Sequence, residues 1–303
     1  MPTGKERVAF TVGSRRLLTI ELRLARLAFT LDDILLQRWP ARPDLADRTG
    51  LRVRSIPTDQ HDALIAAYPG LLPGMINRYR RNFIRMQSSF DDYMNLHSAK
   101  TRQTMRRKAR RFADANAGAL DVREYRGTAQ FEEFLRLALP LSQRTYQARL
   151  LDAGLPGDAA ARARMLDLAA QDRVRAYLLF RDGQPAAYLF LPVHGETVIF
   201  AHLGFDPSLA GLSPGTVLFL GALERLFAER RFTYFDFTEG EGPHKALFGT
   251  DGIECESLVL LEPSLSHRGL LAAHRGFERT IRGTKAIARK LGAEQRLHQL
   301  LRT

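Results

Sequence analysis

Residues 174–203, VRAYLLFRDGQPAAYLFLPVHGETVIFAHL, contain three apolar segments separated by two short polar turns. Both turns carry glycine, as Asp182-Gly183 and as His194-Gly195-Glu196, and such turns between apolar runs are typical of tight hairpins. The pattern therefore predicts a three-stranded antiparallel meander. Its strands are expected over 174–180, 186–192 and 197–203.

A loop rich in Gly, Pro and Ser follows the meander and precedes an apolar helix expected over 216–227. A glycine-bearing loop at a helix N-terminus presents main-chain N–H groups and the positive end of the helix dipole, which suits a diphosphate. The candidate ligands of such a group are Gly211, Ser213, Gly215 and Thr216. Many strand-to-helix turns carry Gly and Pro only to form the bend, so the loop alone leaves both interpretations open.

The flanking sequence predicts an ordered alternation of strands and helices. Strands are expected as a pair over 7–24, and over 120–125, 232–237 and 253–261. Helices are expected from near Asp59, over 131–150 with an interruption near Pro140, and over 159–170. We expect a small β-rich lead-in domain over 1–90, a second domain over 91–265 and a basic amphipathic helix over 266–303.

Ser98 stands at an N-cap position before a segment, 99–112, that lacks Pro and Gly and contains good helix formers. Met105, Ala109 and Phe112 form a narrow apolar seam, and seven Lys or Arg residues occupy most of the remaining circumference without one acid. Such a face repels itself unless an anion covers it. A solvated charged face and an anion-binding surface both fit this pattern.

The composition excludes several classes of protein. The 303 residues include 45% hydrophobic residues, enough for a core, and carry a net charge of +12, which indicates an anionic partner. A single cysteine, Cys255, excludes an internal disulfide, and no Cys/His cluster has zinc-ligand spacing. No apolar run has the length of a membrane span, and no signal-peptide core follows the N-terminus. We expect a cytoplasmic, metal-free protein.

The segment that follows the expected helix 216–227 carries a recognisable motif. Residues 235–249, FDFTEGEGPHKALFG, together with Ser213-Pro214-Gly215 and the basic helix after Ser98, resemble the FemAB-like, cellulose-biosynthesis (CelD-type) acetyltransferase domain of the GNAT superfamily. The resemblance covers roughly 90–262. His244 and Gly242 depart from the family pattern, where Tyr and an acid are usual, so the acceptor pocket is expected to differ.

The resemblance implies an α/β fold with a mixed, largely antiparallel sheet flanked by helices, and a lead-in segment that is a partial domain of the same kind. It also implies transfer of an acyl group to an amine, with acyl-CoA as co-substrate and no metal, or in the Fem relatives with aminoacyl-tRNA as donor. Such a reaction needs a base for the amine proton, a main-chain donor for the oxyanion, and a proton or positive charge for the departing thiolate.

Four residues are the catalytic candidates. His202, near the end of the third meander strand, suits a general base, although a lone strand histidine also serves in core hydrogen bonds. Lys245 matches the family lysine and can steady negative charge, or else pair with Glu239 or Glu241. His244 can relay a proton or simply lie exposed. Asp236 can orient His244 or the amine, or cap the next turn.

The expected substrate-binding residues are Arg144, Tyr146, Tyr234 and Glu239. The two tyrosines are also candidate acids toward the thiolate, although half-buried tyrosines are common in cores. Cys255 has no cationic group beside it in sequence, which indicates a structural role.

The C-terminal segment carries nine Lys or Arg and two acids from Arg268 to Thr303. Its apolar stripe is Leu270, Phe277, Ile281, Ala288 and Leu291. This basic amphipathic helix can lie on anionic lipid or dock on the domain through its stripe. The expected acceptor is an amine, such as a lipid or sphingoid amine in the manner of ceramide synthase, or an amino sugar of an envelope polysaccharide, with loose attachment to the inner membrane.

Two further classes of function remain open. A nucleic-acid-binding protein would use the 98–111 helix and the tail on phosphates, but neither region interleaves aromatic stacking residues. A non-catalytic scaffold of the same fold would bind a membrane or a partner without transferring any group.

Overall fold

The computed structural model describes residues 5–12, 15–145, 154–240 and 242–290. Its contacts divide the chain into two compact units, which are described separately. Unit 1 comprises residues 1–81, 239–241 and 253–303, and unit 2 comprises residues 82–238 and 242–252. The domains expected from the sequence were linear, with boundaries near residues 90 and 265. In the structure unit 1 is discontinuous, because the chain returns to it after unit 2.

The sheet of unit 2 carries the predicted meander. Its strands are β5 (Asp121–Tyr125), β6 (Val174–Arg181), β7 (Gln184–His194), β8 (Thr197–Ile199), β9 (His202–Phe205) and β10 (Tyr234–Asp236). β5, β6 and β7 are antiparallel neighbours, β7 pairs with both β8 and β9, and β10 runs parallel to β8. The last residues of β4 (Leu72–Arg85) pair with β10. The meander is confirmed, but its expected third strand is two short strands, and β10 is shorter than expected.

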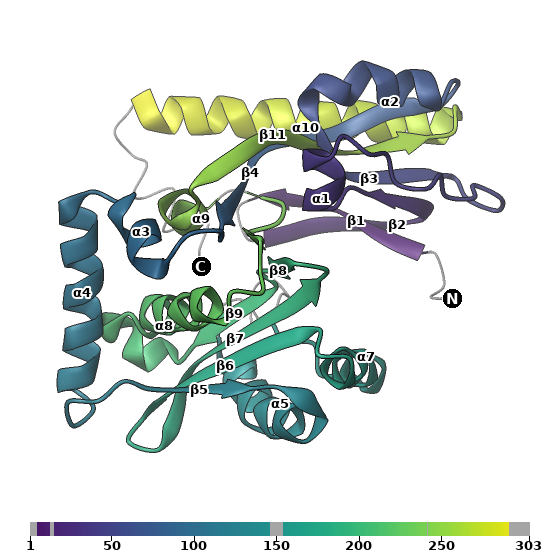
Figure 1. Ribbon diagram of the computed structural model, residues 1–303. Helices are drawn as coiled ribbons and strands as arrows, with labels where there is room; N and C mark the ends of the chain where they lie inside the picture. Colours follow the sequence, from purple (N-terminus) through teal and green to yellow (C-terminus); the bar gives the residue numbers. More distant parts are fainter. Residues whose placement is uncertain (1–4, 13–14, 146–153, 241, 291–303) are drawn as a thin grey trace. The chain divides into compact units, whose positions relative to one another are not determined.

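Helices cover both faces of this sheet (Figure 1). They are α3 (Phe90–Asn95), α4 (Ala99–Asp114), α5 (Gly127–Arg144), α7 (Ala159–Ala170), α8 (Pro214–Glu229), α9 (Pro243–Phe248) and the 3₁₀ segment η2 (Pro207–Leu212). Alternate residues of β6 face opposite layers: Leu178 packs in the α5–α7 cluster, and Tyr177 packs in the α4–α8 cluster. Burial on both faces explains the nearly unbroken apolar runs of the meander.

Two helix predictions had different outcomes. α4 begins after Ser98, whose hydroxyl accepts the Thr101 N–H at 3.2 Å, as expected. The interruption expected near Pro140 is wrong, because α5 continues through it. Pro140 removes one helical hydrogen bond, but its neighbours Ala138 and Leu141 are buried against the sheet, and that packing maintains the helix.

Unit 1 is built on a second group of strands. They are β1 (Lys5–Val12), β2 (Arg15–Ala28), β3 (Gly50–Pro57) and β11 (Asp251–Leu261), in the order β1-β2-β3-β11-β4. β1 and β2 form the predicted hairpin, β2 and β3 are parallel, and β3 and β11 are antiparallel. The short helix expected near Asp59 is confirmed as η1 (Thr58–Gln60) and α2 (His61–Ala67), and α1 (Leu31–Leu35) precedes β3.

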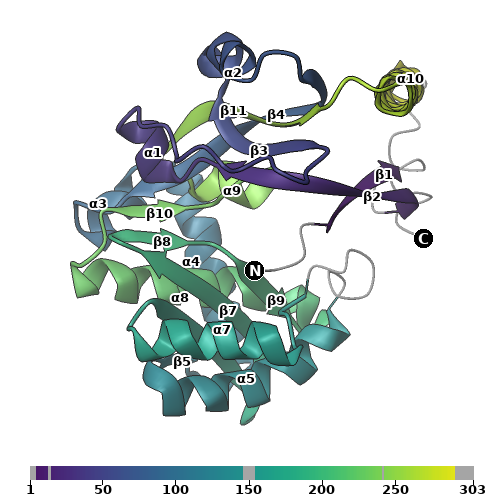
Figure 2. The same ribbon diagram turned by 90° about the vertical axis from the view of Figure 1, so that its right-hand side faces the viewer.

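The tail forms α10 (Leu265–Lys290) in unit 1, which is seen lengthwise in Figure 1 and end-on in Figure 2. Leu271 is buried with Leu22, Leu24, Val259 and Leu261, and Leu270 packs beside them. This part of the helix is docked through its apolar side. The side chains of Ile281 and Ala288, and the whole of Leu291, lie outside the described residues, as does Glu241.

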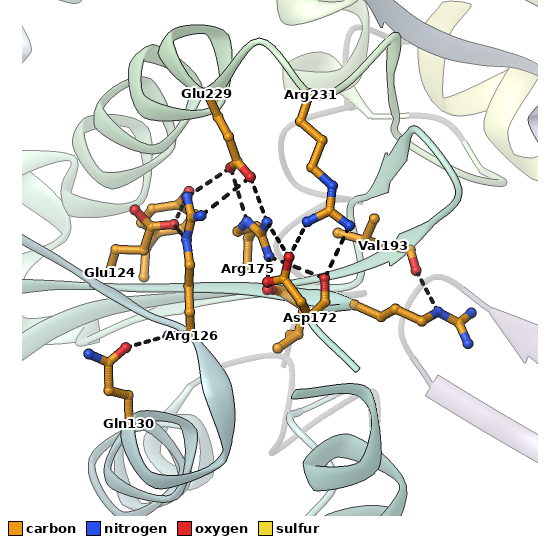
Figure 3. Close-up of polar contacts among 11 residues, drawn as sticks. Glu124, Arg126, Gln130, Asp172, Arg175, Val193, Glu229 and Arg231 are labelled. Carbon is orange, nitrogen blue, oxygen red and sulfur yellow. Dashed lines mark hydrogen bonds and ion pairs between the residues drawn. The ribbon is translucent and has the colours of Figure 1, made fainter. Parts of the chain in front are cut away.

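A network of alternating charges fixes the C-terminal end of α8 (Figure 3). The fully buried Arg175 of β6 donates to Glu229, the last residue of α8, at 2.6 and 3.0 Å, and to Asp172 at 2.8 Å. Arg126 donates to Glu229 at 2.8 Å, while Arg126 also pairs with Glu124 and Arg231 with Asp172. The arginines offset the repulsion between the Glu229 carboxylate and the negative end of the α8 dipole, so α8 is held firmly against β6.

Candidate functional site

A β-bulge opens the sheet where the expected third strand divides. Val193 of β7 pairs with Val198, and Phe190 pairs with His202. Three steps along β7 therefore match four steps along the other strand, so that strand contains one extra residue. The Phe200 N–H donates to the carbonyl oxygen of Asp236 on β10 at 2.9 Å. β8 follows β10 while β9 stays with β7, and the two strands separate at Phe200 and Ala201.

The N-terminus of α8 lies next to this opening. Ser213 has a left-handed backbone (φ 56°, ψ 45°), and its side chain makes no capping hydrogen bond. A non-glycine residue held in this region is strained, and such strain is concentrated at functional sites. A Cβ on Gly215 would lie 3.1 Å from Leu203 and 3.2 Å from Phe205, both on β9. The glycine allows the first turn of α8 to approach the strand closely.

A pocket of about 570 Å³ joins these features within unit 2. It is lined by the bulge and β9, by the first turn of α8, and by α9. The lining includes six of the twelve residues predicted as site residues. These are His202, Ser213, Gly215, Thr216, His244 and Lys245. The loop, the strand and the helix from which these residues were chosen therefore meet around one cavity.

The pocket combines a cation with a neutral imidazole. Lys245 is only 9% exposed, and its charge contributes to the field of the cavity. Burial lowers the pKa of His244, and the neighbouring Lys245 lowers it further. His244 is therefore neutral at pH 7 and able to accept a proton. Its ring lies 5.7 Å from the ring of Phe200 at the bulge.

His202 differs from the other lining residues in the direction of its ring. Its partner in the strand ladder, Phe190, belongs to the cluster under α5, and the two rings stack 6.1 Å apart. The His202 ring therefore lies on the sheet face opposite to α8, at the edge of the opening.

Tyr234 and Asp236 do not line the pocket. They flank Phe235, which packs under α8, so strand alternation places them on the other face of the sheet. The Asp236 carboxylate accepts the Thr238 N–H at 2.8 Å, which is the turn-capping interaction, and the ring of Tyr234 lies edge-on to Phe83. Gly211, in η2, also lies outside the set of lining residues.

The remaining predicted residues lie elsewhere. Arg144 ends α5 and pairs with Asp206 at 3.4 Å. Glu239 belongs to unit 1, where it pairs with Arg54 at 3.3 Å and accepts the Ser257 hydroxyl at 3.0 Å. Tyr146 lies outside the described residues. Cys255 is buried in the core of unit 1, which fits a structural role.

Sequence reasoning did not bring together the apolar side chains that form one wall of the pocket. Phe200, Leu203, Phe219 and Phe248 line it, and the Phe219 and Phe248 rings lie 4.8 Å apart. Phe200 carried no usable signal, because the bulge that exposes it to the cavity was not predicted. The separation of Phe219 and Phe248 in sequence likewise hid their contact.

The described ranges give no indication of a metal site or of a membrane span. No group of three or more His, Cys, Asp or Glu side chains there is arranged to hold a metal ion. Among the same residues, no helix combines the length and the apolar composition needed to cross a bilayer.

The chain matches a known family over its central part. The model described as Acetyltransferase (GNAT) domain matches residues 99–246. This central part of the chain is therefore similar to a GNAT acetyltransferase domain. The match begins at the first residue of α4, ends within α9, and includes every lining residue of the pocket except Phe248. A GNAT domain indicates an acyltransferase, and the predicted fold class, a mixed and mostly antiparallel sheet flanked by helices, is confirmed.

Solved structures share this fold at low sequence identity. The C-terminal domain (DUF2156) of a protein assigned as a lysylphosphatidylglycerol synthetase from Agrobacterium fabrum has a TM-score of 0.51 and 12% identity, covering 76% of this chain and 73% of that one. L-PGS from Bacillus licheniformis has a TM-score of 0.50 and 13% identity, covering 85% of both chains. FemX has a TM-score of 0.50 and 11% identity, covering 85% of this chain and 88% of its own.

At these identities the likeness establishes the fold of the GNAT domain and not its substrates. None of the curated proteins matches the sequence.

Proposed function

We propose that this protein is an N-acyltransferase that moves an acyl group from acyl-CoA to an amine acceptor. The observation that carries the proposal is the juxtaposition of a strained, uncapped helix N-terminus at Ser213 with a strand opening and a buried lysine in one cavity. The helix end suits a diphosphate, and the opening suits a thioester carbonyl beside it. The 235–249 motif supports membership of the FemAB-like, CelD-type branch as part of this proposal.

The donor is held by main-chain groups at the start of α8. Pro214 has no N–H, while the Thr216 and Val217 N–H groups donate to the Ser213 carbonyl at 3.0 and 3.2 Å. The Gly215 N–H and the Ser213 hydroxyl are then the groups of this turn best suited to bind phosphate oxygens. The positive end of α8 adds to their effect.

The bulge supports the chemical step. The extra residue of a bulge has no ladder partner, so a main-chain N–H near Ala201 is available to stabilise the oxyanion that forms on the thioester carbonyl. Attack by a neutral amine forms the C–N bond and expels the thiolate as the C–S bond breaks. The amine proton passes to a base, and the thiolate takes up a proton or remains beside the Lys245 ammonium.

We assign the base role to His244 before His202. The lowered pKa keeps the His244 imidazole neutral, and its ring lies in the pocket beside Phe200. His202 stacks on Phe190 across the sheet, where it can contact an acceptor that approaches the opening from that side. The lysine, rather than a metal, supplies positive charge to the leaving group.

The acceptor is proposed to carry an apolar part, as a lipid or sphingoid amine does. The walls formed by Phe200, Leu203, Phe219 and Phe248 support this more than they support an amino sugar. Peripheral attachment to a membrane would bring such an acceptor to the site.

The donor proposal can be tested by CoA binding. Gly215→Ala places a Cβ against Leu203 and Phe205, and should weaken CoA binding by about tenfold, or about 1.4 kcal/mol. Gly221→Ala, on the same helix, is the matched control. Its added Cβ would lie 3.3 Å from Val122 of β5, away from the pocket. Calorimetric titration with CoA measures both. Equal affinity in the two variants, or no CoA binding by the wild type, would contradict the assignment.

The catalytic roles can be tested by thiol release from acyl-CoA with a panel of amines. His244→Gln should reduce turnover by about 10²-fold or more, as expected for a lost general base, and Lys245→Ala should also reduce it. His202→Ala should affect the apparent affinity for the amine more than the rate. Thermal melting checks that each variant is folded. Wild-type rates in His244→Gln and Lys245→Ala would reject the mechanism, and transfer from charged tRNA but not from acyl-CoA would identify the Fem-like alternative.

A further inference from the structure

The outer face of α4 carries exposed Lys and Arg side chains that form no ion pair with a carboxylate of the described residues. Five of its seven Lys and Arg side chains are exposed, and they are Lys100, Arg106, Arg107, Arg110 and Arg111. The helical period places Lys100, Arg107 and Arg111 along one line, opposite the buried Met105 and Phe112. The face is therefore a continuous cationic stripe on a helix whose other side is fixed in the core.

None of the seven side chains forms an ion pair with a carboxylate in the described part of the chain. Arg102, which is half-buried, donates instead to the His97 carbonyl at 2.6 Å. Elsewhere in unit 2, exposed arginines such as Arg85 and Arg123 pair with Asp251 and Asp121. The stripe has thus kept its full charge in the folded protein, at the cost of repulsion among its members.

Exposed leucines lie at the N-terminal end of the stripe. Leu96, directly after α3, is 70% exposed, and Leu247 of α9 is 43% exposed. Their chain neighbours His97 and Phe248 have ring centroids 6.5 Å apart, and the Tyr93 hydroxyl donates to the Phe248 carbonyl at 3.0 Å. The segments that carry the two exposed leucines are therefore in contact with each other.

We propose that the α4 stripe, together with Leu96 and Leu247, docks this protein on the surface of an anionic phospholipid bilayer. Cations beside protruding aliphatic side chains are the combination that binds anionic lipid, because the cations meet the headgroups and the leucines enter the acyl boundary. A single-stranded nucleic acid would use aromatic side chains for base stacking, and the one aromatic residue of α4, Phe112, is fully buried.

The docking face adjoins the pocket through α9, which carries Leu247 as well as His244 and Lys245. A protein bound through this face would present the pocket close to the membrane surface. The docking itself does not depend on the proposed transferase activity, so the two can fail separately.

The experiment is vesicle cosedimentation with the full chain. The vesicles are phosphatidylcholine alone and phosphatidylcholine with phosphatidylglycerol, at low and at high salt. The test variant is Arg107→Gln/Arg111→Gln. The matched control, Arg162→Gln/Arg164→Gln, removes the same charge from exposed positions of α7, whose helix packs on the other face of the sheet.

The wild type should bind the phosphatidylglycerol vesicles, and binding should weaken at high salt. Each α4 cation removed should reduce partitioning by about fivefold, so the double variant should lose about 25-fold, whereas the control should stay within about twofold. Leu96→Ser should reduce binding by about tenfold at both salt concentrations, because an apolar contact is not screened.

Equal losses in the α4 and α7 variants would overturn the proposal, since net charge alone would then explain binding. Wild-type partitioning of the α4 variant would also overturn it and would leave the tail as the lipid-binding element. Binding to duplex or single-stranded RNA that needs Arg107 and Arg111, without binding to vesicles, would assign the stripe to nucleic acid instead. Because these readouts are independent of thiol release, they stand whether or not the protein transfers an acyl group.

Discussion

Arg175 and Arg107 lie in the same unit and have opposite surroundings. Arg175 is fully buried and is satisfied by Glu229 and Asp172, whereas Arg107 is exposed on a face that forms no ion pair with any described residue. A buried charge without partners is very costly, so the fold supplies carboxylates where an arginine is enclosed. An exposed cation is solvated by water and does not carry this cost. The exposed cations along α4 therefore need no carboxylate among the described residues, and they remain available to an external anion.

The largest effect should come from breaking the buried network. Arg175→Met leaves Glu229 and Asp172 without their main partner, and we expect a loss of about 3–5 kcal/mol in the free energy of unfolding. Urea unfolding measures it. Arg136→Met is the control, because Arg136 is 71% exposed and lies 3.9 Å from Glu133, and it should change stability by less than about 1 kcal/mol. Similar losses in the two variants would remove the contrast between enclosed and open cations.

A smaller effect is expected from substitution of Lys245, which is buried beside His244. The quantity affected is the pKa of His244. Lys245→Met should raise the pKa of His244 toward its ordinary value of about 6.5, because a positive charge that opposes protonation is removed. Histidine NMR titration of the wild type and the variant measures the change. An unchanged His244 pKa would show that burial alone sets it.

The sign of the pH dependence follows from the same shift. The folded pKa of His244 lies below its unfolded value, so the unfolded chain takes up the proton first as pH falls. The contribution of neutral His244 is fully present above about pH 6.5 and decreases as the pH drops from there through the lowered pKa. Thiol release should decrease over the same window, since the protonated ring no longer accepts the amine proton.

The smallest effect should come from the α4 stripe. Arg107→Gln and Arg111→Gln should leave the free energy of unfolding within about 0.5 kcal/mol of the wild type, or raise it slightly by relieving repulsion. Thermal and urea unfolding at low salt check this. A clear destabilisation would mean that these side chains have internal partners and would weaken the contrast with Arg175.

Much of the fold could be predicted because its signals are local. The Asp182-Gly183 turn, the Ser98 cap and the apolar periods of α7 and α8 each depend on a few adjacent residues. The bulge at Phe200 could not be predicted, because it arises from a hydrogen bond to Asp236 on a strand far along the chain. The interruption expected at Pro140 was wrong for a similar reason, because the packing that maintains α5 comes from β6 and β7.

The site residues also divide into those that the local sequence predicts and those that depend on distant parts of the chain. Ser213, Gly215 and Thr216 could be placed from the chemistry of one turn, and they line the pocket with Lys245 and His244. Tyr234 and Asp236 were chosen for their chemistry, yet the alternation of β10 directs Phe235 toward α8 and those two away from it. Which face of a strand meets a cavity depends on the partner layers, and the sequence of three residues does not contain that information.

Clamping α8 at Glu229 has a consequence for its opposite end. Since two arginines immobilise one terminus of this rigid rod against β6, the turn that would receive a nucleotide is already ordered before any ligand arrives. Little conformational freedom is then left for the ligand to remove. Association should therefore be rapid and should require little rearrangement of the turn.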